Sequence, residues 1–340
     1  MYTTFLLGNG FDVCLGLNTR YDDFYKNHYL KLPKDKLPDH LKAFRENIQK
    51  YVIDKLNKVE SEIDWSDLEY ALGQYSEKLE DSNHYIDIIL DVNKELKEYI
   101  QQENERMSLE LSKAKKLLKD FTEPDNEHYL SLQDRQIVRS FKKDVGNAES
   151  IFFMTFNYTN TLEKILSVAD DKSNKPLQNS VGFSVLLKNV LHIHSNLADD
   201  PAILVGVNDA SQIANTAFRD DPDVLDVIVK PRTNDMFGNG KNSRAEELLR
   251  STHLFVLFGV SIGETDKKWW QEIGGMLAKR TSRVIYFVYD KPGESNPLLL
   301  GRKRREYQNK LLKASGFKDS ELNNYRSLIT IAYNTSYFKV

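Results

Sequence analysis

A series of short apolar runs, each ending in a turn, constrains the fold of this chain more than any other feature of its sequence. The runs cover residues 3–7, 151–155, 190–194, 202–207, 254–259, 284–289 and 327–332. Most are apolar throughout instead of alternating, which is typical of strands covered on both faces in a parallel sheet. Helical patterns lie between several of them, at residues 269–280 and 297–314. The sequence therefore predicts an α/β fold with a Rossmann-like, open and mostly parallel sheet.

A long helical segment separates the first run from the second. Residues 34–144 are rich in Lys, Glu, Leu and Tyr, and apolar residues recur at helical spacing, as at Leu68, Ala71, Leu72, Tyr75 and Leu79. We predict that residues 1–33 and 145–340 form the α/β core. Residues 34–144 are predicted as a large helical insertion, which serves as a lid or an interaction subdomain.

Charge and cysteine content exclude several classes of protein. Lys plus Arg total 47 against 50 Asp plus Glu, so the chain lacks the basic excess of a general nucleic-acid binder, and nucleic acid is not an expected partner. The single cysteine, Cys14, excludes an intrachain disulfide and a multi-cysteine metal cluster. The sequence shows neither a secretory signal pattern nor an apolar run of membrane-spanning length, so we expect a cytoplasmic protein that does not enter a membrane.

The first run ends on the turn Gly8-Asn9-Gly10, which is followed by Asp12. In an open α/β sheet, ligands bind beyond the carboxyl ends of the strands, and glycines in such a turn allow backbone amides to approach a phosphate. Gly8, Asn9 and Gly10 are therefore candidate nucleotide contacts. Asp12 is predicted as a ribose contact or as an acidic residue at a helix start. The turn lacks the third glycine of the dinucleotide fingerprint, so a plain strand-to-helix turn is the alternative.

Polar residues also follow the second run. Thr155 precedes Asn157, Thr159 and Asn160 at the end of an apolar segment. Thr159 or Asn160 is predicted to cap the next helix, with Glu163 completing a capping box. That interpretation leaves Asn157 without a structural role, and we predict a functional one.

Two histidines close the third run. Because side chains alternate along a strand, His192 and His194 are expected on the same face, and a two-histidine metal site is one interpretation. No acidic ligand accompanies the pair, so we expect no metal. A histidine at the carboxyl end of a strand is better suited to act as a general base or to contact a ribose hydroxyl.

Two further motifs open with glycine. Asn208 follows Gly206, and residues 259–264 read Gly-Val-Ser-Ile-Gly-Glu. The second string matches Gly-x-Ser-x-Gly, the nucleophile elbow of serine hydrolases, in which the catalytic histidine comes after the serine. No histidine follows Ser261, so that triad order is excluded. Glu264 is predicted as a ribose contact or as an acidic residue at a helix start.

Taken in order, these motifs resemble the AbiH family of bacterial phage abortive-infection proteins across nearly the full length of the chain. The matching pieces are residues 7–12 (Leu-Gly-Asn-Gly-Phe-Asp), 16–24, 65–69 (Trp-Ser-Asp-Leu-Glu), 156–159, 192–194, 206–209 and 259–266. The resemblance implies a role in phage defence and is consistent with a phage-derived trigger.

More remotely, the series resembles the sirtuin-type fold of NAD-consuming enzymes. On this resemblance Asn157 and His194 take the places of the catalytic Asn and His of that fold. Ser195 stands where sirtuins have glycine, and Val260 stands where histidine is common. The zinc-binding cysteines of deacetylating sirtuins are absent from the sequence, which argues against a deacylase and leaves NAD hydrolysis.

The resemblance thus implies an NAD hydrolase that cleaves the nicotinamide–ribose bond, with NAD as substrate and Asn157 and His194 as catalytic residues. Its nucleotide contacts would be Gly8, Asn9, Gly10, Asp12, Thr155, Asn208, Ser261 and Glu264. Two alternatives stay open: a nucleotide-binding sensor without catalysis, and a metal-dependent nuclease built on the strand-end histidines. The exposed helices of the insertion are also consistent with a homo-oligomer.

Overall fold

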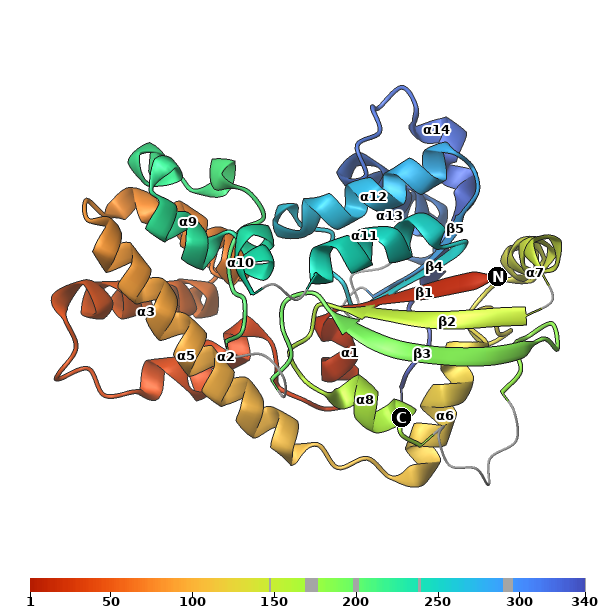
Figure 1. Cartoon of the computed structure of the whole chain (residues 1–340), viewed down its shortest axis with the longest axis horizontal. Coiled ribbons are helices and arrows are strands. Elements are labelled where there is room, and N and C mark those ends of the chain that lie inside the picture. Colours follow the sequence, from red (N-terminus) through yellow and green to blue (C-terminus); the bar gives the residue numbers. More distant parts are fainter. Residues whose placement is uncertain (147, 169–176, 198–201, 238–239, 290–295, 340) are drawn as a thin grey trace. The chain divides into compact units, whose positions relative to one another are not determined.

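A six-stranded parallel sheet, in the order β3-β2-β1-β4-β5-β6, forms the centre of the fold (Figure 1). This computed structural model describes residues 1–146, 148–168, 177–197, 202–237, 240–289 and 296–339. The strands are β1 (Tyr2–Leu7), β2 (Ala148–Thr155), β3 (Ser184–His192), β4 (Leu254–Phe258), β5 (Arg283–Val288) and β6 (Ile329–Tyr333). The predicted α/β, Rossmann-like sheet is confirmed, and its order is that of dinucleotide-binding folds.

One predicted strand is wrong. Residues 202–207 form no strand, and Val207 makes only an isolated bridge with Val229. The segment is apolar because Ile203, Leu204 and Val205 are buried, and not because it pairs in the sheet. A short apolar run does not by itself distinguish a strand from an irregular buried segment.

The chain divides into two compact units. The sheet unit comprises Met1–Gly16, Ser108–Ile193 and Ser243–Val340, and the helical unit comprises Leu17–Met107 and His194–Asn242. The predicted division differs from these units at three places. Residues 17–33 and 194–242 were expected in the core but belong to the helical unit, and residues 108–144 were expected in the insertion but belong to the sheet unit.

Helices cover both faces of the sheet, which gives the sheet unit three layers (Figure 1). On one face Leu6, Phe255 and Tyr286 lie in a core with α11, α12 and α13; on the other face Phe5 and Phe153 lie in a core with α1, α6, α7 and α8. The helices of this unit are α1 (Asn9–Cys14), α6 (Leu111–Thr122), α7 (Leu132–Val145), α8 (Thr161–Leu166), α11 (Lys241–Ser251, from its third residue), α12 (Lys267–Ala278), α13 (Leu300–Ala314) and α14 (Leu322–Tyr325), with 3₁₀ turns at η5 (Glu264–Asp266), η6 (Pro297–Leu299) and η7 (Arg326–Leu328).

The helical unit is organised around α5, a helix of 25 residues whose buried side includes Tyr85, Ile89 and Leu96. Its apolar positions recur at the three- and four-residue spacing that keeps one stripe of a helix against a core. The other helices are α2 (Tyr21–Asn27), α3 (Asp39–Asn57), α4 (Leu68–Tyr75), α9 (Pro222–Ile228) and α10 (Lys230–Met236), with 3₁₀ turns at η1 (Tyr29–Lys31), η2 (Ser76–Lys78), η3 (Ala210–Gln212) and η4 (Thr216–Asp220).

Glycines allow two loops of the sheet unit to meet at the switch point between β1 and β4. A Cβ added at Gly10 would lie 2.5 Å from the Cα of Gly259, and one added at Gly8 would lie 2.5 Å from the Gly259 oxygen. Gly259 itself has φ of +66°, in the left-handed region that favours glycine. The turn after β1 is therefore packed, backbone against backbone, on the turn after β4.

This contact predicts opposite effects for two Gly→Ala substitutions. Gly10→Ala is expected to lower the free energy of unfolding by at least ~2 kcal/mol, because the added methyl group overpacks two backbones. Gly275→Ala, in α12, meets no atom within 4 Å and is expected to raise the free energy of unfolding by ~0.5–1 kcal/mol through helix propensity. Urea denaturation of both variants checks this, and equal effects would contradict the assigned role of Gly10.

Candidate functional site

The register of the sheet brings the ends of β1, β2 and β3 into one row. Leu7 pairs with Thr155, and Thr155 pairs with His192. Asp12 lies in α1 directly after β1, and Asn157 follows β2. Because all three strands are parallel, these residues meet at the carboxyl edge of the sheet, where open α/β folds bind ligands.

Asp12 is the most perturbed carboxyl group at this edge. Its side chain is 1% exposed, and its Oδ2 accepts a hydrogen bond from Thr159 Oγ1 at 2.8 Å. Thr161 Oγ1 in turn donates to Thr159 Oγ1 at 3.0 Å. Burial raises the pKa of Asp12 from 3.8 to about 6, although hydrogen bonds from Thr159, Thr161 and Asn157 and the charge of His192 oppose the rise. Asp12 Oδ1 has no well-aligned partner among the described residues.

Asn157 is held through its backbone. Its N–H donates to Thr155 Oγ1 at 3.1 Å, and Thr155 Oγ1 donates to the Leu7 carbonyl at 3.1 Å. His192 Nδ1 lies 2.9 Å from the Asn157 carbonyl oxygen, and because a carbonyl only accepts, this nitrogen carries the hydrogen. The side chain of Asn157 is thus the part of the residue that these contacts leave for another role.

His192 is fixed at both ring nitrogens, which sequence reasoning missed. Its Nε2 lies 2.6 Å from Glu163 Oε1 on α8. The predicted capping box is therefore wrong: Asn160 precedes α8 without a side-chain bond to the helix, and Glu163 contacts His192 instead. Nothing in the sequence signals this pair, because 29 residues separate its members.

The glycine turn uses its amides internally. Gly8 N donates to the Phe258 carbonyl and Gly10 N to the Gly259 carbonyl, each at 3.0 Å, and Phe11 N donates to the Gly8 carbonyl at 2.9 Å. Close packing therefore explains both glycines. Asn9 begins α1. Contacts of Gly8, Asn9 and Gly10 with a phosphate stay a prediction.

The predicted residues after β4 lie at the surface of the sheet unit. Ser261 is exposed, and the side chain of Glu264 is 60% exposed and pairs with Lys267 at 3.0 Å. Glu264 also opens the short helical turn η5, as expected for an acidic residue at a helix start. Their contacts with a nucleotide remain predictions.

His194 and Asn208 belong to the helical unit, whereas the other predicted residues belong to the sheet unit. His194 is buried, and its carbonyl accepts from Leu204 N at 3.0 Å. The Asn208 N–H donates to Gln212 Oε1 at 2.7 Å, beside a capping box formed by Asp209 and Gln212. Asn208 thus contributes to a local helix start, and a nucleotide contact of this residue stays a prediction.

Ser195, next to His194, has a conformation that favours glycine. Its φ is +93°, its side chain is fully buried, and its hydroxyl has no hydrogen-bond partner among the described residues. The left-handed region costs a residue with a Cβ ~1–2 kcal/mol. The backbone after His194 is therefore held in a strained conformation by its surroundings.

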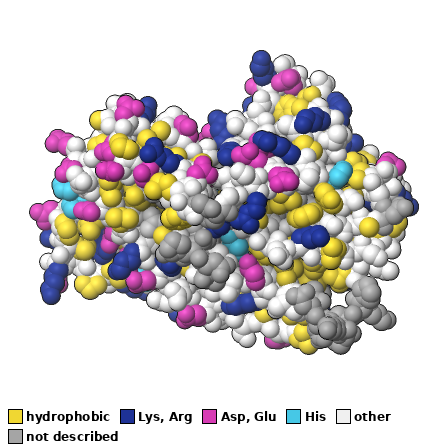
Figure 2. Space-filling view, in the orientation of Figure 1, with side chains coloured by type: hydrophobic (Ala, Val, Ile, Leu, Met, Phe, Trp, Pro, Cys, Tyr) yellow, Lys and Arg dark blue, Asp and Glu magenta, His cyan; other side chains and the backbone are white. Residues whose placement is uncertain are grey.

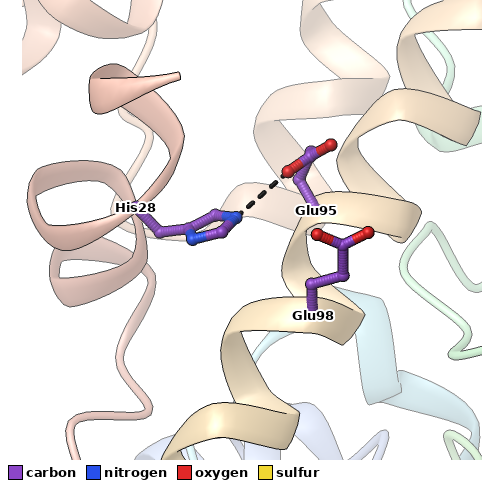
Figure 3. Close-up of side chains that lie close together, drawn as sticks. All are labelled: His28, Glu95 and Glu98. Carbon is purple, nitrogen blue, oxygen red and sulfur yellow. Dashed lines mark hydrogen bonds and ion pairs between the residues drawn. The ribbon is translucent and has the colours of Figure 1, made fainter.

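One group of side chains in the helical unit has the spacing of a metal site (Figure 3). It consists of His28, Glu95 and Glu98 and includes neither strand-end histidine. Glu95 accepts from Lys94 Nζ at 2.7 Å and lies 3.0 Å from His28 Nε2, so both of its oxygens are engaged. Although burial opposes it, Lys94 and His28 lower the pKa of Glu95. We interpret the group as an ion-pair cluster that already contains its cation.

Surface charge shows no single sign on the face drawn in Figure 2, where Lys and Arg side chains lie among Asp and Glu side chains. Among the described residues, no helix combines the length and the apolar character needed to cross a membrane.

The strand order and the parallel register define a Rossmann-like α/β protein. A comparison with protein families matches residues 4–289 to the family described as bacteriophage abortive infection AbiH. The chain belongs to this family, and its role is therefore in phage abortive infection. A search of curated proteins found no match.

The buried carboxyl group predicts an unusual dependence of stability on pH. Because the pKa of Asp12 is raised in the folded state, its contribution to stability is fully present below pH ~4 and is lost as pH rises through ~6. At pH 7.5 the free energy of unfolding of Asp12→Asn is therefore expected to exceed that of the wild type by up to ~3 kcal/mol. Near pH 4 this difference should disappear. Urea denaturation at several pH values measures the difference. Asp39→Asn, which removes an exposed carboxylate, is the control, and parallel curves for wild type and Asp12→Asn would exclude the assignment.

Ser195 yields a second stability prediction. Ser195→Gly removes a Cβ from a left-handed backbone and loses no described hydrogen bond. We expect it to raise the free energy of unfolding by ~1 kcal/mol after the entropic cost of glycine, whereas Ser195→Val should lower it. Thermal unfolding of the two variants checks the order, and a destabilised glycine variant would show that the hydroxyl has a role.

Proposed function

We propose that this chain is an NAD hydrolase that cleaves the nicotinamide–ribose bond during phage abortive infection. The observation that carries the proposal is the strand order β3-β2-β1-β4-β5-β6 with Asp12, Asn157 and His192 grouped at the carboxyl edge beside its switch point. That edge is where such folds bind dinucleotides. The resemblance of the motif order to sirtuin-like NADases supports the same reaction.

The reaction needs few groups from the protein. The bond between ribose C1′ and the nicotinamide nitrogen breaks with its electron pair leaving on nicotinamide, and a water oxygen adds to C1′ of the oxocarbenium-like species while a base takes the water proton. Positioning and exclusion of solvent supply most of the rate. We assign the side chain of Asn157 to hold the water or a ribose hydroxyl, and His194 to accept the proton.

The proposal predicts that turnover depends on the Asn157 side chain. Asn157→Ala keeps the backbone N–H and carbonyl that contact Thr155 and His192, so folding should be preserved. We expect at least ~100-fold slower nicotinamide release from NAD, the size typical of a lost positioned group. Purified wild type and variant are compared by chromatography of NAD and nicotinamide.

Asn309→Ala is the matched control, because Asn309 is a half-buried amide on α13 that pairs with Arg326. It should release nicotinamide at the wild-type rate. Binding of NAD by the purified protein is measured by calorimetry. Binding without loss of NAD, both in the purified system and in phage-infected cells, would favour the nucleotide-binding sensor. If the protein neither binds NAD nor turns it over, whether purified or in phage-infected cells, the proposal is contradicted.

A further inference from the structure

One side chain contacts both the start of the loop that follows β2 and the helix to which that loop leads. His192 is the last residue of β3, is 5% exposed, and pairs in the sheet with Thr155. Its Nδ1 lies 2.9 Å from the carbonyl oxygen of Asn157, and its Nε2 lies 2.6 Å from Oε1 of Glu163 in α8. A carbonyl and a carboxylate oxygen both accept, so the ring serves as a donor on both sides. No step of the proposed reaction uses this residue.

We propose that His192 is a positioning residue: its Nδ1–H holds the Asn157 carbonyl group and thereby sets the direction of the Asn157 side chain. Glu163 orients the ring that does so. The inference rests on the proposed function for its catalytic consequence, whereas the contacts themselves do not depend on that function. Of the two strand-end histidines, His192 is the one that lies in the same unit as Asn157.

The planarity of the peptide bond converts these contacts into a fixed direction. Each peptide group is planar, so its N–H and its C=O lie in one plane with the flanking Cα atoms. The Asn157 N–H donates to Thr155 Oγ1 at 3.1 Å, which fixes the plane before the Asn157 Cα. The carbonyl held by His192 fixes the plane after it. With both planes fixed, φ and ψ of Asn157 are fixed, and so is the direction of its Cα–Cβ bond.

The imidazole ring is itself placed by rigid parts of the sheet unit. The pairing of β2 with β3 continues to the strand ends, where Ile193 N donates to the Thr155 carbonyl at 3.0 Å. Glu163 restrains rotation of the ring, because a rotated ring would lose its Nε2 contact. A group on a strand end that is locked by a second contact holds its neighbour more precisely than a group on a loop does. A displacement of ~1 Å can slow a reaction roughly 100-fold.

Two replacements of His192 separate its two contacts. In Asn the side-chain amide nitrogen occupies about the position of Nδ1, whereas in Gln it occupies about that of Nε2, and both nitrogens are donors. His192→Asn therefore keeps the contact with the Asn157 carbonyl, and His192→Gln keeps only the contact with Glu163. We expect His192→Gln to lower kcat for NAD hydrolysis ~10–100-fold with KM within ~3-fold of the wild type. His192→Asn should keep kcat within ~3-fold of the wild type.

His253→Gln is the control, because His253 is another histidine of the sheet unit whose Nδ1 contacts the backbone, at 3.2 Å from the Tyr2 nitrogen. It should hydrolyse NAD at the wild-type rate. Equal kcat values for His192→Gln and His192→Asn, whether both are lowered or both unchanged, would overturn the positioning role while leaving the hydrolase proposal intact.

Glu163 provides a second test that leaves the buried ring in place. Its side chain is 37% exposed, so its replacement is not expected to prevent folding. Glu163→Ala should lower kcat in the same direction as His192→Gln, because the ring loses its orienting partner. Glu163→Gln, whose amide oxygen still accepts from Nε2, should restore most of the lost rate. Equal rates in these two Glu163 variants would refute the orienting role of Glu163.

A spectroscopic readout tests the contact without turnover. The sequence contains two Asn-Tyr pairs, at residues 157–158 and 324–325. Protein labelled with ¹³C-carbonyl asparagine and ¹⁵N-tyrosine therefore gives two carbonyl signals, and Asn157→Ala removes one of them. Because hydrogen bonding deshields a carbonyl carbon, the Asn157 signal should move upfield in His192→Gln and keep its position in His192→Asn. The Asn324 carbonyl, which accepts from Arg280 at 3.0 Å, should move in neither variant.

The carbonyl signal and the rate of NAD hydrolysis distinguish failure of this inference from failure of the hydrolase proposal. An Asn157 carbonyl signal that does not move in His192→Gln would refute the contact, and the positioning role with it. A signal that moves in a protein that hydrolyses no NAD, whether purified or in phage-infected cells, would retain the contact but refute the hydrolase and the catalytic consequence of the contact.

Discussion

The contact between the turn after β1 and the turn after β4 is the constraint on which the site depends. β1 and β4 are neighbours in the sheet, and Gly8, Gly10 and Gly259 let the two turns touch where a Cβ would clash. The carbonyls of Phe258 and Gly259 accept hydrogen bonds from the amides of Gly8 and Gly10. These bonds fix the start of α1, which begins at Asn9, two residues after β1 ends. Asp12 then lies one helical turn from the end of β1, against Thr159.

Two buried carboxyl groups lie at opposite ends of the strands of the sheet unit, and their pKa values are shifted in opposite directions. Toward the amino ends of the strands, Asp125 pairs with buried Lys142 at 2.9 Å, and Ser180 and Arg139 also donate to it. Although burial opposes them, these partners lower the pKa of Asp125. Asp12, at the carboxyl end, receives only neutral donors in direct contact, and its pKa is raised. A buried ion pair is compatible with a structural role, whereas a carboxyl group perturbed by burial at a ligand-binding edge is typical of a functional one.

Whether a feature of the fold or the site could be predicted from sequence depends on how far apart in the sequence the interacting residues lie. The strands that flank the site, and the glycines that end two of them, follow from local apolar runs and turn chemistry, so the parallel sheet was predicted correctly. Residues 202–207 have the same composition as a strand but pack in the helical unit, because burial and pairing demand similar residues. The contact between Glu163 and His192 joins two elements through the register of β2 and β3, which no local pattern encodes. A capping motif was the local interpretation of Glu163, and a tertiary contact replaced it.

The motifs shared with the AbiH family also separate by what they do in the structure. Three motif residues of the helical unit have structural explanations: Trp65 packs on Phe44 at 5.3 Å, Glu69 pairs with Lys230 at 2.7 Å, and Asp209 caps a helical turn. In the sheet unit the glycines are explained by close packing. The burial of Asp12 raises its pKa and reduces stability at neutral pH, so stability does not explain this residue of the motif.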